Sequence, residues 1–159
     1  MNKLYLLLGS NQGNSKTQLA EAIKQIEKQI GSITRQSALY STAAWGNTKQ
    51  PDFLNQVVIV ETKLSATQTM QTILKIEKKM GRIRTIKNAP RIIDIDILFF
   101  NKEIINEAEL TVPHPQIQNR RFVLVPLNQL SPNLKHPLLN KTVHQLLINC
   151  PDELNVKKF

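Results

Sequence analysis

The sequence predicts an α+β fold of the ferredoxin-like type: a β-α-β-β-α-β sandwich whose helices cover one face of an antiparallel sheet, followed by a C-terminal extension. Three observations support this prediction. Short apolar or β-branched runs alternate with two longer stretches whose apolar residues recur at helical spacing. Glycine and polar turn residues separate these segments. The length of 159 residues, 41% of them hydrophobic, suits a single domain over residues 1–159 with a buried core.

The first three expected elements are a strand, a helix and a strand. Residues 4–9 form a short apolar run that ends in a glycine and two polar residues, which predicts a buried strand and then a turn. Asn14 or Ser15 can cap the following helix, and Gly31 can end it. Residues 33–40 have the composition of a strand.

The next three elements are a strand, a helix and a strand again. Residues 53–61 contain a β-branched run and predict a strand. Ser65 can cap a second helix, which Gly81 ends, and residues 91–100 again have strand composition. The pattern is weak in the last third of the chain, which holds six of the eight prolines. There we expect one short helix within residues 134–148.

Two segments have no periodic pattern and are predicted as loops. Residues 41–52 are polar and include a glycine and a proline, whereas residues 82–90 are basic. A long loop inside a compact domain is more often functional than idle. Because residues 82–90 offer no apolar anchor, we expect them to be mobile without a ligand and to close over one when it binds.

The formal net charge of +9 is concentrated in one part of the chain. Seven basic residues and one acid, Glu77, lie between Lys75 and Arg91. This cluster fits an anionic partner, namely nucleic acid, an acidic membrane surface or a phosphorylated small molecule, but a solvated basic face is the alternative. The lone Cys150 cannot form an internal disulfide, so we expect a cytoplasmic protein. No apolar run approaches the roughly 20 residues that cross a bilayer.

Asp94 and Asp96 are the sharpest candidates for a catalytic site. On a strand they point the same way, because side chains alternate between the two faces. Two carboxylates on an isoleucine-rich strand repel each other and resist desolvation, and a hard cation such as Mg²⁺ relieves both penalties. Nearby arginines suit a polyphosphate held together with such an ion. The alternative is the exposed face of an edge strand, where an acid pair costs little.

Five further residues are candidates for ligand contacts. His114 lies between two prolines that restrict its backbone, and Arg120 could grip a phosphate through two hydrogen bonds. Phe53 and Asn55 share one strand face and could stack on and read a flat heterocycle. A structural histidine, a core Phe53 and a core Phe122 are the alternatives.

Several motifs of other enzyme classes are absent from the sequence. It contains no GxxxxGK[ST] phosphate loop and no GxGxxG, HExxH or GxSxG motif. Without a covalent nucleophile, positioning and electrostatics remain, which suits phosphoryl-type transfer. An RNA-binding module on the same fold is one alternative, although its aromatic strand motif is missing. A metal-dependent phosphohydrolase is another, but it leaves Phe53 and Asn55 unexplained.

Five motifs occur in order along residues 4–128: Leu8-Gly9-Ser10-Asn11, Pro51-Asp52-Phe53-Leu54-Asn55, Gly81-Arg82-Ile83-Arg84, Pro90-Arg91-Ile92-Ile93-Asp94-Ile95-Asp96 and Leu110-Thr111-Val112-Pro113-His114-Pro115. Together they closely resemble those of the 6-hydroxymethyl-7,8-dihydropterin pyrophosphokinases of folate biosynthesis. The resemblance implies a ferredoxin-like fold and transfer of diphosphate from ATP to the hydroxymethyl group of a reduced pterin, with release of AMP. It implies these two small molecules as partners, rather than nucleic acid or a membrane, and we expect a monomer.

The resemblance also implies roles for individual residues. Asp94 and Asp96 would hold two Mg²⁺ ions, and together with Arg82 and Arg91 they would form the catalytic set. The residues implied in binding ATP are Glu77, Arg82, Arg84, Arg91, Ile97, His114 and Arg120. The residues implied in binding the pterin are Thr42, Ala43, Trp45, Phe53, Asn55 and Phe122.

Four positions, at three places in the chain, depart from the family pattern. Ala43 stands where proline is common, and Phe53 where tyrosine is common, which keeps the stacking ring but loses a hydroxyl. Residues 88–89 are Asn-Ala where Trp-Gly is common, which implies a different cover over the nucleotide. None of these departures falls on Asp94 or Asp96.

Overall fold

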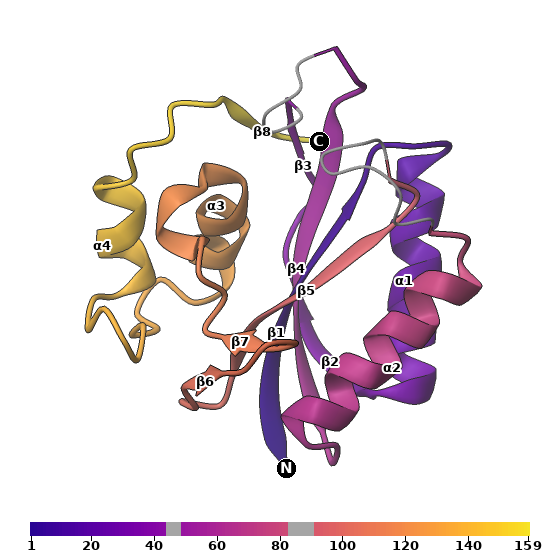
Figure 1. The fold of residues 1–159 in the computed structure, drawn as a ribbon. Helices are drawn as coiled ribbons and strands as arrows, with labels where there is room; N and C mark the ends of the chain where they lie inside the picture. Colours follow the sequence, from indigo (N-terminus) through magenta and orange to yellow (C-terminus); the bar gives the residue numbers. More distant parts are fainter. Residues whose placement is uncertain (44–48, 83–90) are drawn as a thin grey trace.

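The computed structural model describes residues 1–43, 49–82 and 91–159, and Figure 1 shows its ribbon. Its elements in chain order are β1 (Asn2–Ser10), α1 (Ser15–Gln29), β2 (Gly31–Gln36), β3 (Tyr40–Thr42), β4 (Phe53–Thr62), α2 (Ala66–Lys79), β5 (Asp94–Phe100), β6 (Ile105–Asn106), β7 (Thr111–Val112), the 3₁₀ turn η1 (Ile117–Asn119), α3 (Arg121–Leu130), α4 (Val143–Ile148) and β8 (Val156–Lys158). The succession of β1, α1, β2, β4, α2 and β5 is the predicted β-α-β-β-α-β order.

The main sheet is antiparallel, with β1 and β4 at its centre. β1 pairs with β5 on one side and with β4 on the other. β2 pairs with the C-terminal half of β4 and β3 with its N-terminal end, and β8 adds to β3. β6 and β7 form a separate two-stranded sheet. The sheet order β5-β1-β4-β2 and the two helical crossovers confirm the ferredoxin-like fold.

One layer of the sandwich is formed by α1 and α2, which lie together on one face of the sheet (Figure 1). Both predicted caps are present: the side chain of Asn14 accepts the Thr17 amide at 3.1 Å, and Ser65 forms a capping box with Gln68. Leu4, Leu6 and Leu8 of β1 point into this layer and belong to its core. They are completely buried, so this layer anchors the sheet.

The opposite face of the sheet is covered by α3 and α4 (Figure 1). Tyr5 and Leu7, the alternate residues of β1, pack in a second core with Leu127 of α3 and Val143 of α4. β1 is therefore buried on both faces, which explains why it reads as a continuous apolar run rather than an alternating one. The prediction of helices on one face holds for α1 and α2 only, because the C-terminal extension supplies the second layer.

Helix α3 is absent from the sequence prediction. Its apolar residues Val123, Leu124, Leu127 and Leu130 do recur at helical spacing, and all four are buried. Pro126 lies inside the helix, and Arg120 at its start provides no side-chain cap. A proline removes one backbone donor and normally argues against a helix. Burial of the apolar stripe outweighs both local signals.

Three other boundaries differ from the prediction. The strand expected at 33–40 is divided into β2 and β3, because the hydroxyl of Ser37, rather than a backbone carbonyl, accepts the Val57 amide at 3.0 Å. β5 begins at Asp94 and not at residue 91. The late helix is confirmed but short, since α4 covers only Val143–Ile148 of the expected range. In the described ranges, none of the helices has the length and apolar character that crossing a membrane requires.

Candidate active site

Gly9 of β1 lies at the centre of the candidate site. It faces Asn55 of β4 on one side and Asp94 of β5 on the other. Because side chains alternate along a strand, Asp96 points to the same face as Asp94. A Cβ atom at Gly9 would lie only 2.9 Å from the Asn55 Oδ1 atom. A side chain at position 9 would therefore collide with Asn55, and glycine lets the Asn55 amide lie close to the β1 backbone.

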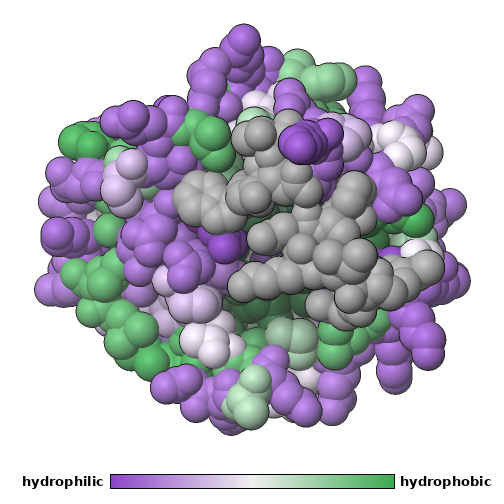
Figure 2. All heavy atoms as spheres, turned by 45° about the horizontal axis from the view of Figure 1, so that its top comes forward, coloured by the Kyte–Doolittle hydropathy of each residue, from purple (hydrophilic) through white to green (hydrophobic). Residues whose placement is uncertain are grey.

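A cavity of about 320 Å³ opens above these strand ends, on the face that carries α3. Its lining includes many of the residues singled out from the sequence, namely Thr42, Ala43, Phe53, Asn55, Arg82, Arg91, Asp94, Asp96, His114, Arg120 and Phe122. Leu7, Gly9 and Gln50 line it as well. This end of the molecule comes forward in Figure 2, where hydrophilic side chains make up much of the visible described surface.

A second cavity, of about 270 Å³, adjoins the first, because Asp96 and His114 line both. Its other walls come from Met70 of α2, from Ile95 and Ile97 of β5, and from the segment 108–111. Met70, Ile95 and Ile97 make one side of the second cavity apolar, and Asp96 adds a carboxyl group where the two cavities meet. Ile97, implied as an ATP contact, is found here rather than in the first cavity.

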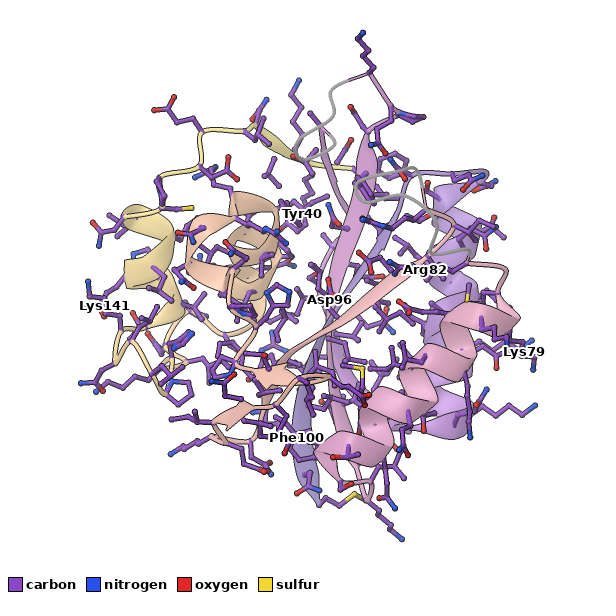
Figure 3. All side chains as sticks on the ribbon, in the orientation of Figure 1. Tyr40, Lys79, Arg82, Asp96, Phe100 and Lys141 are labelled. Carbon is purple, nitrogen blue, oxygen red and sulfur yellow. The ribbon has the colours of Figure 1, made fainter. Side chains whose placement is uncertain are left out.

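Arg82 is the centre of an ion-pair network in the wall of the first cavity. Its guanidinium donates to Asp94 and, at 2.9 Å, to Glu77. Glu77 also accepts the backbone amide of Ile95 at 2.8 Å, which ties the end of α2 to β5. Arg91 reaches the other oxygen of Asp94 at 3.6 Å. Arg82 and Asp96 both lie beside β5 in Figure 3.

Glu77, which the family resemblance implies in binding ATP, is one of the buried residues next to the first cavity. It is only 1% exposed and lines neither cavity. Burial lowers the pKa of Arg82, but the charges of Asp94 and Glu77 outweigh burial and raise it. In this structure Glu77 therefore holds Arg82 and the β5 backbone in place.

Asp96 and Arg120 carry opposite charges, and each affects the pKa of the other. Burial, followed by the charges of Asp94 and Glu77, raises the pKa of Asp96 to about 7. Burial also lowers the pKa of Arg120, although Asp96 and Asp94 act in the opposite direction. Ionising Asp96 beside Asp94 therefore costs free energy in the absence of a cation. A bound divalent ion would reduce this cost.

His114 is neutral at pH 7. Burial and the nearby Arg120 charge lower its pKa to about 4. Its backbone amide donates to the Leu98 carbonyl at 3.0 Å, and its Nδ1 atom accepts the Gln116 amide at 3.1 Å. A neutral imidazole whose Nδ1 accepts carries its proton on Nε2. His114 is thus fixed in the tautomer that can donate a hydrogen bond to a phosphate oxygen.

The aromatic and amide residues lie at the β4 end of the cavity. Asn55 is 3% exposed, and its Nδ2 atom has no hydrogen-bond partner among the described residues. A buried amide without a partner loses free energy that a ligand acceptor would restore. Phe53 and Phe122 line the same cavity, and the guanidinium of Arg120 lies 5.7 Å from the Phe122 ring centre. Both rings therefore reach the cavity, and Phe122 also packs against the second core.

Some expected site residues could not be placed, and others were not expected. Trp45 and Arg84 lie outside the described residues, as do residues 83–90 of the segment expected to close over the nucleotide. Leu7 and Gly9 could have been found from the alternation along β1, because they share a face with the second core. Gln50 lies in a patternless stretch, and no sequence signal marked it.

A family model for 7,8-dihydro-6-hydroxymethylpterin-pyrophosphokinase (HPPK) matches residues 5–132, which include every strand and helix that builds the two cavities. The chain belongs to the HPPK family. This membership, and not the fold, favours a diphosphokinase over the RNA-binding module and the phosphohydrolase, because the fold is shared by unrelated functions.

The relatives of the chain carry names that agree with this family. A 2-amino-4-hydroxy-6-hydroxymethyldihydropteridine pyrophosphokinase of Synechocystis sp. is 40% identical over 141 residues, covering 88% of this chain and 72% of the relative. Another, of Aquifex aeolicus, is 38% identical and covers 91% of this chain and 90% of the relative. The folic acid synthesis protein FOL1 of Dictyostelium discoideum is 37% identical over 98% of this chain, which spans only 23% of that protein.

The HPPK fold is also found among solved structures. The crystal structure of the wild-type HPPK-DHPS of Plasmodium falciparum with pteroate matches with a TM-score of 0.76. The match covers 93% of this chain and 42% of the other, at 22% sequence identity. At that identity the likeness supports the ferredoxin-like fold alone.

Proposed function

We propose that this chain transfers diphosphate from ATP to the hydroxymethyl group of 6-hydroxymethyl-7,8-dihydropterin, with release of AMP, as a step in folate synthesis. The observation that carries the proposal is one cavity with two chemically different ends. One end has aromatic rings and a buried amide nitrogen that has no partner among the described residues, and the other has two carboxylates among arginines. A flat heterocycle suits the first end and a polyphosphate suits the second.

The pterin would lie between Phe53 and Phe122, with its polar edge toward Asn55. The Nδ2 atom of Asn55 supplies the donor that a ring acceptor requires. Thr42 and Ala43 would form the wall beside the ring. The hydroxymethyl group would point past Gly9 toward Asp94 and Asp96, which line the same cavity.

ATP would span both cavities. Its phosphates would lie in the first cavity, close to Arg82, Arg91 and Arg120, and would accept a hydrogen bond from the Nε2 atom of His114. Its base would enter the second cavity, against the apolar wall that includes Ile97. Asp96 and His114 stand where the two cavities meet, which is where the triphosphate would pass.

Asp94 and Asp96 would hold two Mg²⁺ ions with the triphosphate. The donor set fits, because carboxylate oxygens suit Mg²⁺, and because burial and then the charges of Asp94 and Glu77 raise the pKa of Asp96, a cost that a cation would offset. In the part of the chain that the structure describes, no three His, Cys, Asp or Glu side chains form a complete metal site. Phosphate oxygens and water would complete the coordination. Bound Mg²⁺ would neutralise phosphate charge and make the β-phosphorus easier to attack.

The chain itself would catalyse the reaction by positioning and by charge neutralisation. The hydroxyl oxygen of the pterin would attack the β-phosphorus of ATP while the bond from that phosphorus to the α-phosphate oxygen breaks. AMP would leave, and the hydroxyl proton would pass to solvent. Arg82, Arg91 and Arg120 would offset the charge that develops on the transferred and leaving groups. We assign no general base. We also propose that residues 1–159 work as one domain, as a monomer and in the cytoplasm.

The direct test is incubation of the protein with ATP, Mg²⁺ and 6-hydroxymethyl-7,8-dihydropterin, followed by chromatography. The expected products are AMP and the diphosphorylated pterin in equal amounts. A parallel reaction without the pterin separates the alternatives, because a phosphohydrolase would release phosphate or AMP there too. Absence of both products in the complete reaction would overturn the proposal.

A further inference from the structure

Asn11 follows β1 directly and is 3% exposed, yet it lines neither cavity. On one side it pairs with Arg91 through two hydrogen bonds. The Asn11 backbone amide donates to the Arg91 carbonyl at 3.0 Å, and the Arg91 amide donates to the Asn11 Oδ1 atom at 2.8 Å. This pairing lies just beyond the Gly9–Asp94 register and holds the backbone of Arg91 beside β1.

The other side of the same amide group binds the segment that leads into β4. The Asn11 Nδ2 atom donates to the Gln50 Oε1 atom at 2.6 Å and to the Pro51 carbonyl at 3.1 Å. Gln50 lines the first cavity, and Pro51 lies two residues before Phe53. The buried side chain of Asn11 therefore connects two parts of the site. One is the segment before β4, next to the proposed pterin site, and the other is Arg91, which we propose binds phosphate.

The pattern of these hydrogen bonds requires an amide. The Arg91 amide needs an acceptor, whereas the Pro51 carbonyl and the Gln50 Oε1 atom need donors. Asparagine supplies both kinds of group in one plane. A carboxylate of the same shape keeps the acceptor and loses both donors, and alanine loses all of them.

We propose that Asn11 is a positioning residue, which sets the place of Arg91 on the phosphate side and of the Gln50–Pro51 segment on the pterin side through separate arms of its side chain. The inference rests on the proposed function, since it assigns each arm to one substrate. It predicts that the two arms can be separated by the choice of substitution.

The test compares Asn11→Asp with Asn11→Ala. Calorimetry measures the affinity of each folded variant for a non-hydrolysable ATP analogue with Mg²⁺ and, separately, for the pterin. Asn11→Asp keeps the Arg91 arm, so we expect pterin affinity to fall by about tenfold and nucleotide affinity to change by less than about threefold. Asn11→Ala should weaken both. Asn14→Asp is the matched control, because it makes the same charge change at an exposed helix cap, where aspartate also caps well.

A second measurement needs no ligand. Hydrogen exchange of the Arg91 amide, followed by NMR, should become faster in Asn11→Ala and stay slow in Asn11→Asp, because only the latter retains the acceptor. Equal losses of both affinities in the two variants, or wild-type affinities in both, would overturn the inference. Absence of AMP formation by the wild-type protein, with the exchange pattern as expected, would instead overturn the proposed function.

Discussion

At the scale of single residues, the charge of Asp96 is the most sensitive feature of the site. Asp96 is half-buried near Asp94, and the charges of Arg82 and Arg120 also act on its carboxylate. We expect Asp96→Ala to lower kcat by at least about 100-fold without unfolding the protein, because the phosphates lose a metal ligand in the transition state. AMP formation across a Mg²⁺ titration measures the effect, with the exposed Glu103→Ala as control. Near wild-type turnover would contradict the metal assignment.

Asn55 provides a residue-scale test of the pterin end. Its Nδ2 atom is buried, and no described group accepts a hydrogen bond from it. Asn55→Ala should weaken pterin binding by about 1–3 kcal/mol, because polar groups on the ring then stay unpaired. The affinity for a non-hydrolysable ATP analogue should stay nearly constant. Equal losses for the two ligands in calorimetry would show that Asn55 does not read the pterin.

His136 links stability to pH, away from the site. Burial lowers its pKa, and its Nδ1 atom accepts the amides of Leu138 and Leu139, each at 3.1 Å. A depressed histidine pKa means that the unfolded chain binds the proton first as the pH falls. The contribution of neutral His136 to the free energy of unfolding is therefore complete above about pH 6.5 and is lost progressively at lower pH.

His136→Asn tests this linkage. An asparagine oxygen can still accept an amide but does not titrate. Between about pH 7.5 and pH 5, the free energy of unfolding in urea should fall less in the variant than in the wild-type protein. Parallel losses in the two proteins would exclude His136 as the titrating group.

At the scale of elements, the C-terminal strand supports the pterin side of the site. β8 lies beside β3 (Figure 1) and pairs with it. The Thr42 hydroxyl donates to the Asn155 carbonyl at 3.2 Å. Deletion of residues 155–159 leaves β3 as an unsupported edge, so we expect a several-fold higher KM for the pterin and little change in KM for ATP. Steady-state kinetics measures both. An equal rise in the two KM values would mean that β8 supports the whole fold instead.

At the scale of the whole molecule, the sheet separates two cores. Leu127 of α3 is completely buried in the second core, with Tyr5, Leu7 and Phe99. Leu127→Ala should lower the free energy of unfolding by about 2–5 kcal/mol, because it leaves a cavity under the face that carries the site. Leu138→Ala, at a position 59% exposed, is the control and should change stability by less than about 0.5 kcal/mol. Urea denaturation of both variants measures the difference.

The elements of the first 100 residues could be predicted because their signals are local. Helical spacing, the caps Asn14 and Ser65, and the β-branched run of β4 all lie within a few residues of the structure that they specify. The same is true of the two pairs Asp94/Asp96 and Phe53/Asn55, because alternation along a strand places each pair on one face. Helix α3 was not predicted, because Pro126 argues locally against a helix. The apolar residues of α3 pack on the second face of the sheet, which is far away in the sequence.

The sequence by itself determined the β-α-β-β-α-β order, the two residue pairs and, through its motifs, the family. Only the tertiary structure decided that the pairs share one cavity, because antiparallel pairing across Gly9 brings β4 and β5 to the two sides of β1. It also decided that Glu77 accepts the backbone amide of Ile95, 18 residues away, and that Asn11 binds Arg91 across 80 residues of chain. Hydrogen bonds over such separations depend on how whole strands pair. No local pattern of residue types encodes that pairing.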